Sequence, residues 1–328
     1  MRFRPVSAVA LMSGALLALT ACSSGTTTDT GGGGGGAATS AAMTRTVESP
    51  YTGTTVEIPT NPQRVVALWR TGSALAELGV VPVGALEGEL IQEEQPAETW
   101  AKVKDVPTVG TYDGVDVEKL IATKPDLIVG MDRGELSIDY AAVSQVAPTV
   151  VLKIAEPTDV WDNYPKLADL VGKSSDFETR EAALDASLAA VKSQYGSVIG
   201  SKQVTSLGST AGKIWVQTSK ALTYRRITAA GFGYNPTYTD NPQRYVTELS
   251  TENLASLANQ DALFYEVDVD GKVTPDMQKV LDSDSWKRLP AVVAGHAFPL
   301  TSGTNYTFVA AEKEAADLQA AAQKLAGS

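Results

Sequence analysis

One stretch near the middle of the chain, residues 174–195, constrains the fold more than any other. Its apolar residues recur at spacings typical of one face of an α-helix: Phe177, Leu184, Leu188, Val191 and Tyr195. Ser174 and Ser175 are suited to cap the start, and Gly196 is suited to end it. A helix of about twenty residues spans roughly 30 Å, the width of a small domain. The sequence therefore predicts a long helix over 174–196 that joins two lobes.

On each side of this helix, short apolar runs alternate with helical patterns. Before it, the expected strands are 65–69, 81–85, 106–109, 127–129 and 149–152, with helices over 73–78, 115–123 and 159–171. After it, the expected strands are 204–207, 214–216, 262–267 and 297–300, with helices over 222–230, 249–257 and 308–325. Such alternation is typical of mostly parallel sheets covered by helices. We therefore expect a fold of two Rossmann-like α/β lobes, an N-terminal lobe over 45–173 and a C-terminal lobe over 197–328.

The N-terminus has the pattern of a targeting segment. Arg2 and Arg4 precede an apolar run, Val6–Leu19, and Leu19-Thr20-Ala21-Cys22 resembles the lipobox of bacterial lipoproteins. A membrane-spanning anchor is the alternative, but the run is short and no charged stop-transfer segment follows. We interpret 1–21 as a lipoprotein signal peptide and Cys22, the only cysteine, as the lipidation site. The Gly-rich segment 22–44 is then a flexible linker to a lipid anchor on the outer face of the bacterial cytoplasmic membrane.

Composition excludes several classes of function. A net charge of −11 disfavours a nucleic-acid binder, whose affinity depends on basic surface. A single histidine, His296, cannot build a multi-histidine metal site, and lipidation of Cys22 leaves no thiol. No nucleophile elbow or phosphate loop is present, which argues against an enzyme. We therefore expect no cofactor and no protein-held metal, and a ligand that brings its own metal donors.

Four segments resemble a known family. They are Ile58–Val66, Leu78–Gly84, Lys124–Val129 and Trp286–Val292. Together they are similar to the substrate-binding proteins of iron–siderophore and cobalamin ABC importers. The resemblance implies two lobes joined by one long helix, with a ligand cleft between them. It also implies a monomeric receptor, with no enzymatic activity, that captures a ferric siderophore and delivers it to an ABC permease. Cobalamin or haem capture remains an alternative, as do a secreted hydrolase and a structural lipoprotein of the cell wall.

In open α/β sheets, ligands bind beyond the carboxyl ends of the strands. The candidate ligand-binding residues at these places are Trp69, Arg70, Tyr112, Met131, Arg133, Trp215, Tyr224, Arg225, Arg226, Tyr238 and Tyr306. Aromatic faces and arginine forks suit a bulky chelate with carboxylate, catecholate or hydroxamate oxygens. Abundant aromatic residues with few arginines favour a hydroxamate-type siderophore. In the alternative interpretation, the tryptophans lie in the core and the arginines on the solvated surface.

Two glutamates stand at matching places in a weak internal repeat. Glu118 and Glu252 each open a helical segment that is followed by a buried strand. The resemblance implies that they pair with arginines of the permease, one acid from each lobe. The alternative is that both are helix N-terminal acids stabilised by the helix dipole.

Overall fold

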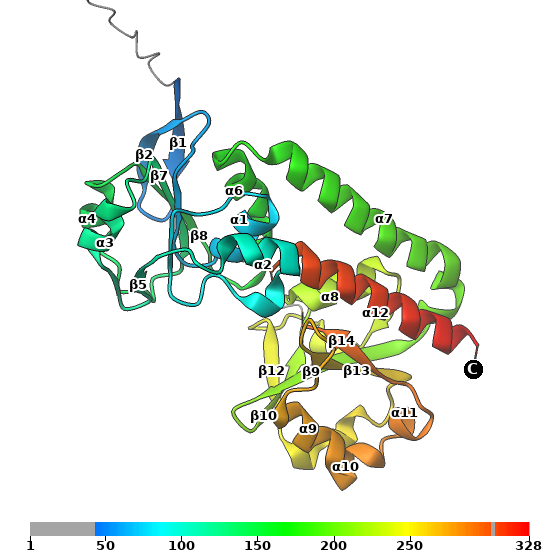
Figure 1. Cartoon of the computed structure of the whole chain (residues 1–328). Coiled ribbons are helices and arrows are strands. Elements are labelled where there is room, and N and C mark those ends of the chain that lie inside the picture. The colour runs from blue at the N-terminus through cyan, green and yellow to red at the C-terminus, as the bar shows by residue number, and fades with distance from the viewer. Residues whose placement is uncertain (1–42, 303–305, 328) are drawn as a thin grey trace, which may run out of the picture. The chain divides into compact units, whose positions relative to one another are not determined.

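The computed structural model of the protein describes residues 43–302 and 306–327 (Figure 1). The predicted signal peptide, the lipidation site Cys22 and the linker up to residue 42 lie outside this part of the chain. Described residues form two α/β lobes on either side of one long helix, which confirms the predicted fold class. Among the described helices, none combines the length and the apolar character that crossing a bilayer requires.

The N-terminal lobe is built on a sheet in the order β6-β5-β4-β3-β7-β8, parallel except for the short edge strand β6. Its strands are β3 (Val65–Ala67), β4 (Gly84–Leu86), β5 (Thr108–Thr111), β6 (Gly114–Val115), β7 (Leu127–Asp132) and β8 (Thr149–Lys153). Its helices are α1 (Gly72–Glu77), η1 (Gln92–Glu94), α2 (Ala97–Val103), α3 (Val117–Ala122), α4 (Tyr140–Ser144), α5 (Thr158–Asp162) and α6 (Tyr164–Leu170). Every residue of β7 is buried, as expected for a central parallel strand.

The C-terminal lobe has a mixed sheet in the order β12-β10-β9-β13-β14, with β11 beside β9. Its strands are β9 (Gln203–Thr210), β10 (Lys213–Gln217), β11 (Gly233–Tyr234), β12 (Val246–Leu249), β13 (Ala262–Val267) and β14 (Ala297–Thr301). Its helices are α8 (Leu222–Ala229), η2 (Pro236–Tyr238), η3 (Thr251–Leu257), α9 (Pro275–Asp282), α10 (Asp284–Lys287) and α11 (Pro290–Val293). β9 and β10 form a hairpin, because Ala211 and Gly212 both adopt positive φ at the turn.

Two helices, not one, pass between the lobes. α7 (Ser174–Ile199) begins in the core of the N-terminal lobe with Phe177 and continues in the core of the C-terminal lobe with Leu184. The C-terminal helix α12 (Phe308–Ala326) does the same, because Phe308 packs in the first core and Leu318 in the second. The two helices pack along each other (Figure 1). α7 runs through Gly196 and ends at Ile199, beyond its predicted end.

Three other details differ from the sequence-based expectation. The helix predicted over 159–171 is broken into α5 and α6 at Asn163, with Pro165 in the first turn of the second piece. The helix predicted over 249–257 is a strand end followed by the 3₁₀ helix η3. An antiparallel hairpin of β1 (Thr44–Ser49) and β2 (Thr54–Pro59) precedes the first sheet, and its pattern was not recognised in the sequence.

Candidate ligand-binding cleft

On the N-terminal lobe, the surface of the candidate cleft is formed by the loops that follow β3, β5 and β7. Trp69 and Arg70 come directly after β3, Tyr112 follows β5, and Arg133 follows β7. These strand ends meet at one edge of the parallel sheet, where open α/β sheets bind ligands. The structure thus brings together four of the residues that the sequence nominated.

A buried acid fixes the loop that carries Arg70. Arg70 adopts a left-handed backbone conformation, with φ of 63°. Next to it, the backbone N–H groups of Thr71 and Gly72 donate to Glu89 Oε2 at 3.0 and 3.2 Å. Burial raises the pKa of Glu89 to about 7, although these backbone hydrogen bonds and Arg70 lower it. Glu89 therefore holds the turn in which the arginine is presented.

Guanidinium groups and aromatic rings alternate across this surface. The Cζ atom of Arg70 lies 5.2 Å from the ring centroid of Trp69 and 5.3 Å from that of Tyr306. Arg133 Cζ lies 5.7 Å from the Trp69 ring, and its guanidinium also pairs with exposed Glu135. Such cation–π contacts hold the rings and the charges in one layer.

Of these residues, Trp69, Arg70 and Tyr306 line a cavity of about 230 Å³. Its lining includes Trp69, Arg70, Ser73, Glu89, Glu94, Tyr112 and Tyr306. Burial raises the pKa of Glu94, opposed by a hydrogen bond from Ser73. The cavity thus carries aromatic faces, a guanidinium and two acids whose ionised forms are disfavoured.

A second cavity, of about 340 Å³, lies on the C-terminal lobe. Its lining residues come from β9, β10, β12, β13 and the loop before β12: Thr210, Trp215, Gln217, Arg244, Tyr245, Val246 and Glu266. Burial raises the pKa of Glu266, opposed by a hydrogen bond from Ser302. A Cβ at Gly208 would collide with Glu266 Oε2, so a larger residue there would displace this carboxylate.

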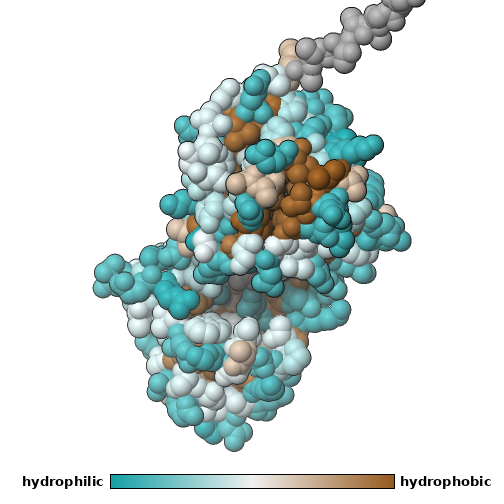
Figure 2. Space-filling model, turned by 90° about the vertical axis from the view of Figure 1, so that its left-hand side faces the viewer, coloured by the Kyte–Doolittle hydropathy of each residue, from teal (hydrophilic) through white to brown (hydrophobic). Residues whose placement is uncertain are grey.

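Tyr306 connects the two cavities electrostatically. Burial raises the pKa of its phenol to about 12, and the phenol also lies within electrostatic range of Arg70, Arg133, Tyr245 and Glu266. Arg70 lines the first cavity, and Tyr245 and Glu266 line the second, so charges of both cavities act on this phenol. In Figure 2 the surface is hollowed between the two lobes, and hydrophobic residues gather on the N-terminal lobe.

The sequence did not indicate the charged and aromatic cleft residues Glu89, Glu94, Arg244, Tyr245 and Glu266. The adjacent pair Arg244-Tyr245 could have indicated a ligand-binding position, because it places a guanidinium and an aromatic ring just before a strand. The buried acids gave no signal, because acids are frequent throughout this chain.

The remaining nominated residues lie elsewhere. Met131 is buried in the core of the N-terminal lobe, and Tyr238 is buried in the core of the C-terminal lobe. Tyr224 packs edge-to-face on Tyr234 at 5.0 Å between centroids. Neither Tyr224 nor these two core residues lines either cavity.

Arg225 and Arg226 are held in ion pairs. Exposed Arg225 donates to Asp162 of the N-terminal lobe at 2.6 and 3.0 Å. Arg226 is buried and pairs with buried Glu314 of α12 at 2.6 Å. Both guanidinium groups are thus paired with carboxylates of the protein, and neither arginine lines one of the two cavities.

The two glutamates of the internal repeat are exposed. Glu118 lies in the first turn of α3 and Glu252 in the first turn of η3. Hydrogen bonds from its own backbone N–H and from Ser250 lower the pKa of Glu252. Both carboxylates are accessible to a partner.

Metal-binding groups are not clustered in the described residues, where no group of three or more His, Cys, Asp or Glu side chains could hold an ion. His296 Nδ1 lies 3.2 Å from the carbonyl oxygen of Asp261, and its ring stacks on Phe298. The cleft is suited to bind an anionic or polar ligand with flat faces by cation–π, stacking and charge-assisted contacts.

Comparison with known proteins gives a consistent result. Residues 73–304 match the periplasmic binding protein family. The chain is 28% identical over 294 residues to the probable siderophore-binding lipoprotein YfiY of Bacillus subtilis, which covers 86% of each protein. It is 27% identical over 265 residues to the iron(3+)-hydroxamate-binding protein FhuD of the same organism, covering 75% of this chain and 76% of that protein.

Solved structures share the fold. A siderophore periplasmic binding protein from the fuscachelin gene cluster of Thermobifida fusca matches with a TM-score of 0.71 at 22% identity, covering 81% of this chain and 98% of that one. FhuD2 of Staphylococcus aureus with bound ferrioxamine B matches with a TM-score of 0.61 at 22% identity, covering 80% and 99%. The relatives named here are binding proteins rather than enzymes. Since the family match runs through both lobes and the helix between them, this chain belongs to the periplasmic binding protein family.

Proposed function

We propose that this protein is a monomeric, lipid-anchored receptor that captures a ferric siderophore outside the cytoplasm and delivers it to an ABC permease. The observation that carries the proposal is the layer of Trp69, Arg70 and Tyr306, in which one guanidinium lies 5.2 and 5.3 Å from two ring centroids. Flat faces around a fixed positive charge suit a chelate whose outer oxygens carry partial negative charge.

The charge balance of the cleft favours a hydroxamate-type chelate. Arg70, Arg133 and Arg244 supply positive charge, but Glu89 and Glu94 lie beside Arg70, and Glu266 stands in the second cavity with Arg244. A tris-catecholate carries several negative charges, which three guanidinium groups with acids beside them would balance only in part, whereas a hydroxamate chelate of low charge needs no such balance. The relative described as an iron(3+)-hydroxamate-binding protein supports this choice.

Anchoring and delivery follow from features outside the cleft. Cys22 in its lipobox-like context supplies the anchor, and relatives named as lipoproteins support it. Exposed Glu118 and Glu252 supply contacts for a permease. The protein needs no cofactor, since the iron arrives within the ligand.

The test is a titration of intrinsic tryptophan fluorescence with ferrioxamine B, ferric dicitrate, a ferric tris-catecholate, haem and cobalamin. We expect quenching by ferrioxamine B with Kd below about 1 μM, which corresponds to roughly −8 kcal/mol. Saturable binding of haem or cobalamin alone would support the alternative ligand classes. Absence of binding to all five would contradict the proposal.

A matched pair of variants locates the site. Arg70→Gln should weaken ferrioxamine B binding by at least about tenfold, because it removes the charge that exposed Arg70 holds between two partly buried rings. Arg45→Gln is the control, since Arg45 is on the N-terminal lobe, pairs with Asp169 at 2.8 Å and lines neither cavity. Equal effects of both variants would argue against the cleft.

A further inference from the structure

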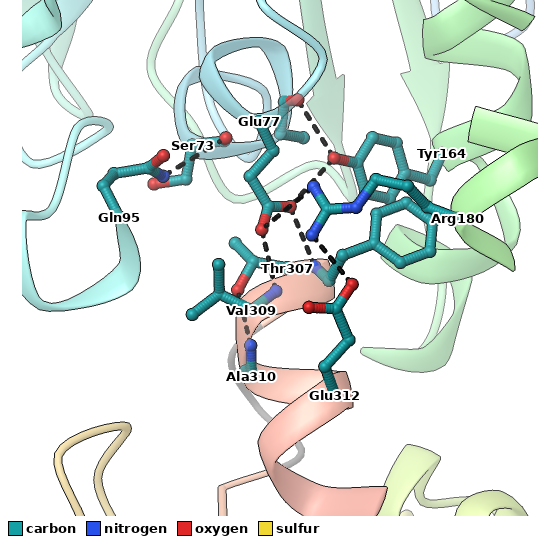
Figure 3. Close-up of polar contacts among 11 residues, drawn as sticks. Ser73, Glu77, Gln95, Tyr164, Arg180, Thr307, Val309, Ala310 and Glu312 are labelled. Carbon is teal, nitrogen blue, oxygen red and sulfur yellow. Dashed lines mark hydrogen bonds and ion pairs between the residues drawn. The ribbon is translucent and has the colours of Figure 1, made fainter. Parts of the chain in front are cut away.

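Glu77 connects the first helix that the structure describes, α1, to the last, α12. It lies at the end of α1, and its side chain is 1% exposed. Its carboxylate accepts hydrogen bonds from the backbone N–H of Phe308 and of Val309, both at 2.8 Å (Figure 3). These are two of the unpaired donors at the N-terminus of α12, where the helix dipole favours a negative charge.

Every element around this carboxylate contributes a partner. The Tyr164 hydroxyl of α6 lies 3.0 Å from Glu77 Oε2, and Arg180 of α7 lies 3.8 Å from Oε1. Arg180 also pairs with exposed Glu312 of α12 at 3.0 Å and lies 4.6 Å from the ring of Phe308. Burial raises the pKa of Glu77 to about 6, although the two N–H groups, Arg180 and Tyr164 lower it.

The first turn of α12, to which Glu77 is hydrogen-bonded, lies next to Tyr306 in the chain. Thr307 caps α12 by accepting a hydrogen bond from the N–H of Ala310 at 3.3 Å, and Tyr306 immediately precedes it. The Tyr306 ring lies 5.3 Å from Arg70 Cζ. The position of this ring in the cleft therefore depends on where α12 begins.

We propose that Glu77 is a positioning residue for ligand binding, which caps the N-terminus of α12 and thereby places Tyr306 over Arg70. Glu77 is not among the residues that line the two cavities, so it acts through Tyr306. The inference rests on the proposed function for its effect on affinity, whereas the cap itself can be tested without a ligand.

The first experiment measures the cap in the ligand-free protein at pH 8. Amide hydrogen–deuterium exchange is compared for wild type, Glu77→Ala, Glu77→Gln and Glu312→Gln. Loss of the acceptor should speed exchange of the amides of Phe308 and Val309 by about tenfold or more in Glu77→Ala. Glu77→Gln keeps one acceptor oxygen and should show a smaller change. The control Glu312→Gln removes the other partner of Arg180 and should leave these amides protected.

The second experiment asks whether Glu77 acts through Tyr306. Affinity for ferrioxamine B is measured for Glu77→Ala, Tyr306→Ala and the double variant. Each single variant should weaken binding by about tenfold, and the double variant should be no weaker than Tyr306→Ala, because a positioning residue has nothing left to position.

The outcomes distinguish the proposed role of Glu77 from the proposed function of the protein. Unchanged exchange in Glu77→Ala would overturn the cap. Unchanged affinity in Glu77→Ala, with a lowered melting temperature, would show a purely structural role, as would strictly additive losses in the double variant. If wild type bound none of the chelates, the proposed function would fail, while the exchange experiment would still decide the cap.

Discussion

Arg226 and Trp161 meet across the boundary between the lobes, with the Cζ atom of Arg226 4.6 Å from the indole centroid. Arg226 belongs to α8 of the C-terminal lobe and Trp161 to α5 of the N-terminal lobe. The same guanidinium pairs with Glu314, whose side chain is fully buried. Arg226 Nη2 and Glu314 Oε1 have no hydrogen-bond partner within the described structure. A buried ion pair thus lies where the lobes join.

The first prediction compares two adjacent arginines. Arg226→Ala should lower the free energy of unfolding by about 3–5 kcal/mol, because it leaves the buried carboxylate of Glu314 without its cation. Arg225→Ala should lower it by less than about 1 kcal/mol, because the pair with Asp162 is exposed. Urea unfolding of both variants is the measurement. Equal losses in the two would show that burial does not distinguish them.

The second prediction concerns the aromatic face of the cleft. Trp69→Ala removes a half-buried ring that contacts two guanidinium groups. We expect ferrioxamine B affinity to fall by at least about tenfold, which is in line with ~1.5–3 kcal/mol for burial of a large side chain. The fold should survive. Normal binding with a strongly lowered melting temperature would instead assign Trp69 to the core.

The third prediction is a pH dependence of stability. Burial raises the pKa of Glu89 from 4.5 to about 7, so between these values the folded protein binds a proton that the unfolded chain does not. Stability from this group is therefore full below pH 4.5 and falls as the pH rises through 7. Glu77, with a pKa raised to about 6, contributes in the same direction.

Glu89→Gln should flatten this profile. Between pH 5 and 8 the wild type should lose up to about 3 kcal/mol more than the variant, since each pKa unit corresponds to about 1.4 kcal/mol. Urea unfolding across this range is the measurement, and Glu93→Gln, an exposed neighbour on η1, is the control. Superimposable profiles of wild type and Glu89→Gln would refute a buried, protonated acid.

Periodicity was sufficient for the helices that organise the fold. The spacing of Phe177, Leu184 and Leu188 predicted α7, and all three are buried. The pattern over 308–325 predicted α12, but not that its first turn belongs to the N-terminal lobe. That arrangement depends on Glu77, which is distant in sequence from its partners Phe308 and Val309. No local pattern encodes such a contact.

The sequence predicted which residues follow the ends of strands, but not where their side chains point. Arg225 and Arg226 are neighbours in the middle of α8, yet one is exposed and the other is buried. The repeated sequence Asn-Pro-Gln-Arg makes the same point. Arg64 donates to the carbonyl oxygens of Thr123 and Lys124, whereas Arg244 lines the second cavity. Tertiary partners, and not residue type, separate structural from ligand-facing arginines.

The fourth prediction concerns the anchor. Cys22→Ala removes the only thiol in the chain, so the lipid has no alternative attachment point. We expect unprocessed or released protein in place of the membrane-bound form, because stable binding to a bilayer needs the acyl chains that Cys22 would carry. Fractionation of cells expressing either form is the measurement. Normal processing and membrane recovery of the variant would refute the lipobox.

The last prediction separates capture from delivery. Glu118 and Glu252 open corresponding helical segments of the two lobes and both are exposed, so a permease could contact them together. An exposed ion pair is worth about 0.2–1 kcal/mol, but two acids on one rigid body gain from effective concentration. We therefore expect Glu118→Ala with Glu252→Ala to reduce uptake more than the two single variants suggest.

Binding by the double variant should be unchanged, because neither acid lines a cavity. The measurements are titration of the purified protein with ferrioxamine B and uptake of radiolabelled iron by cells carrying it. Glu248→Ala with Glu312→Ala is a control of equal charge change, since both acids are exposed and lie outside the cavities. If the double variant Glu118→Ala with Glu252→Ala supported uptake at the wild-type level, a docking role would be dismissed. Lost binding would place these acids in the ligand site or the fold, while equal loss of uptake in the control would assign the effect to net charge alone.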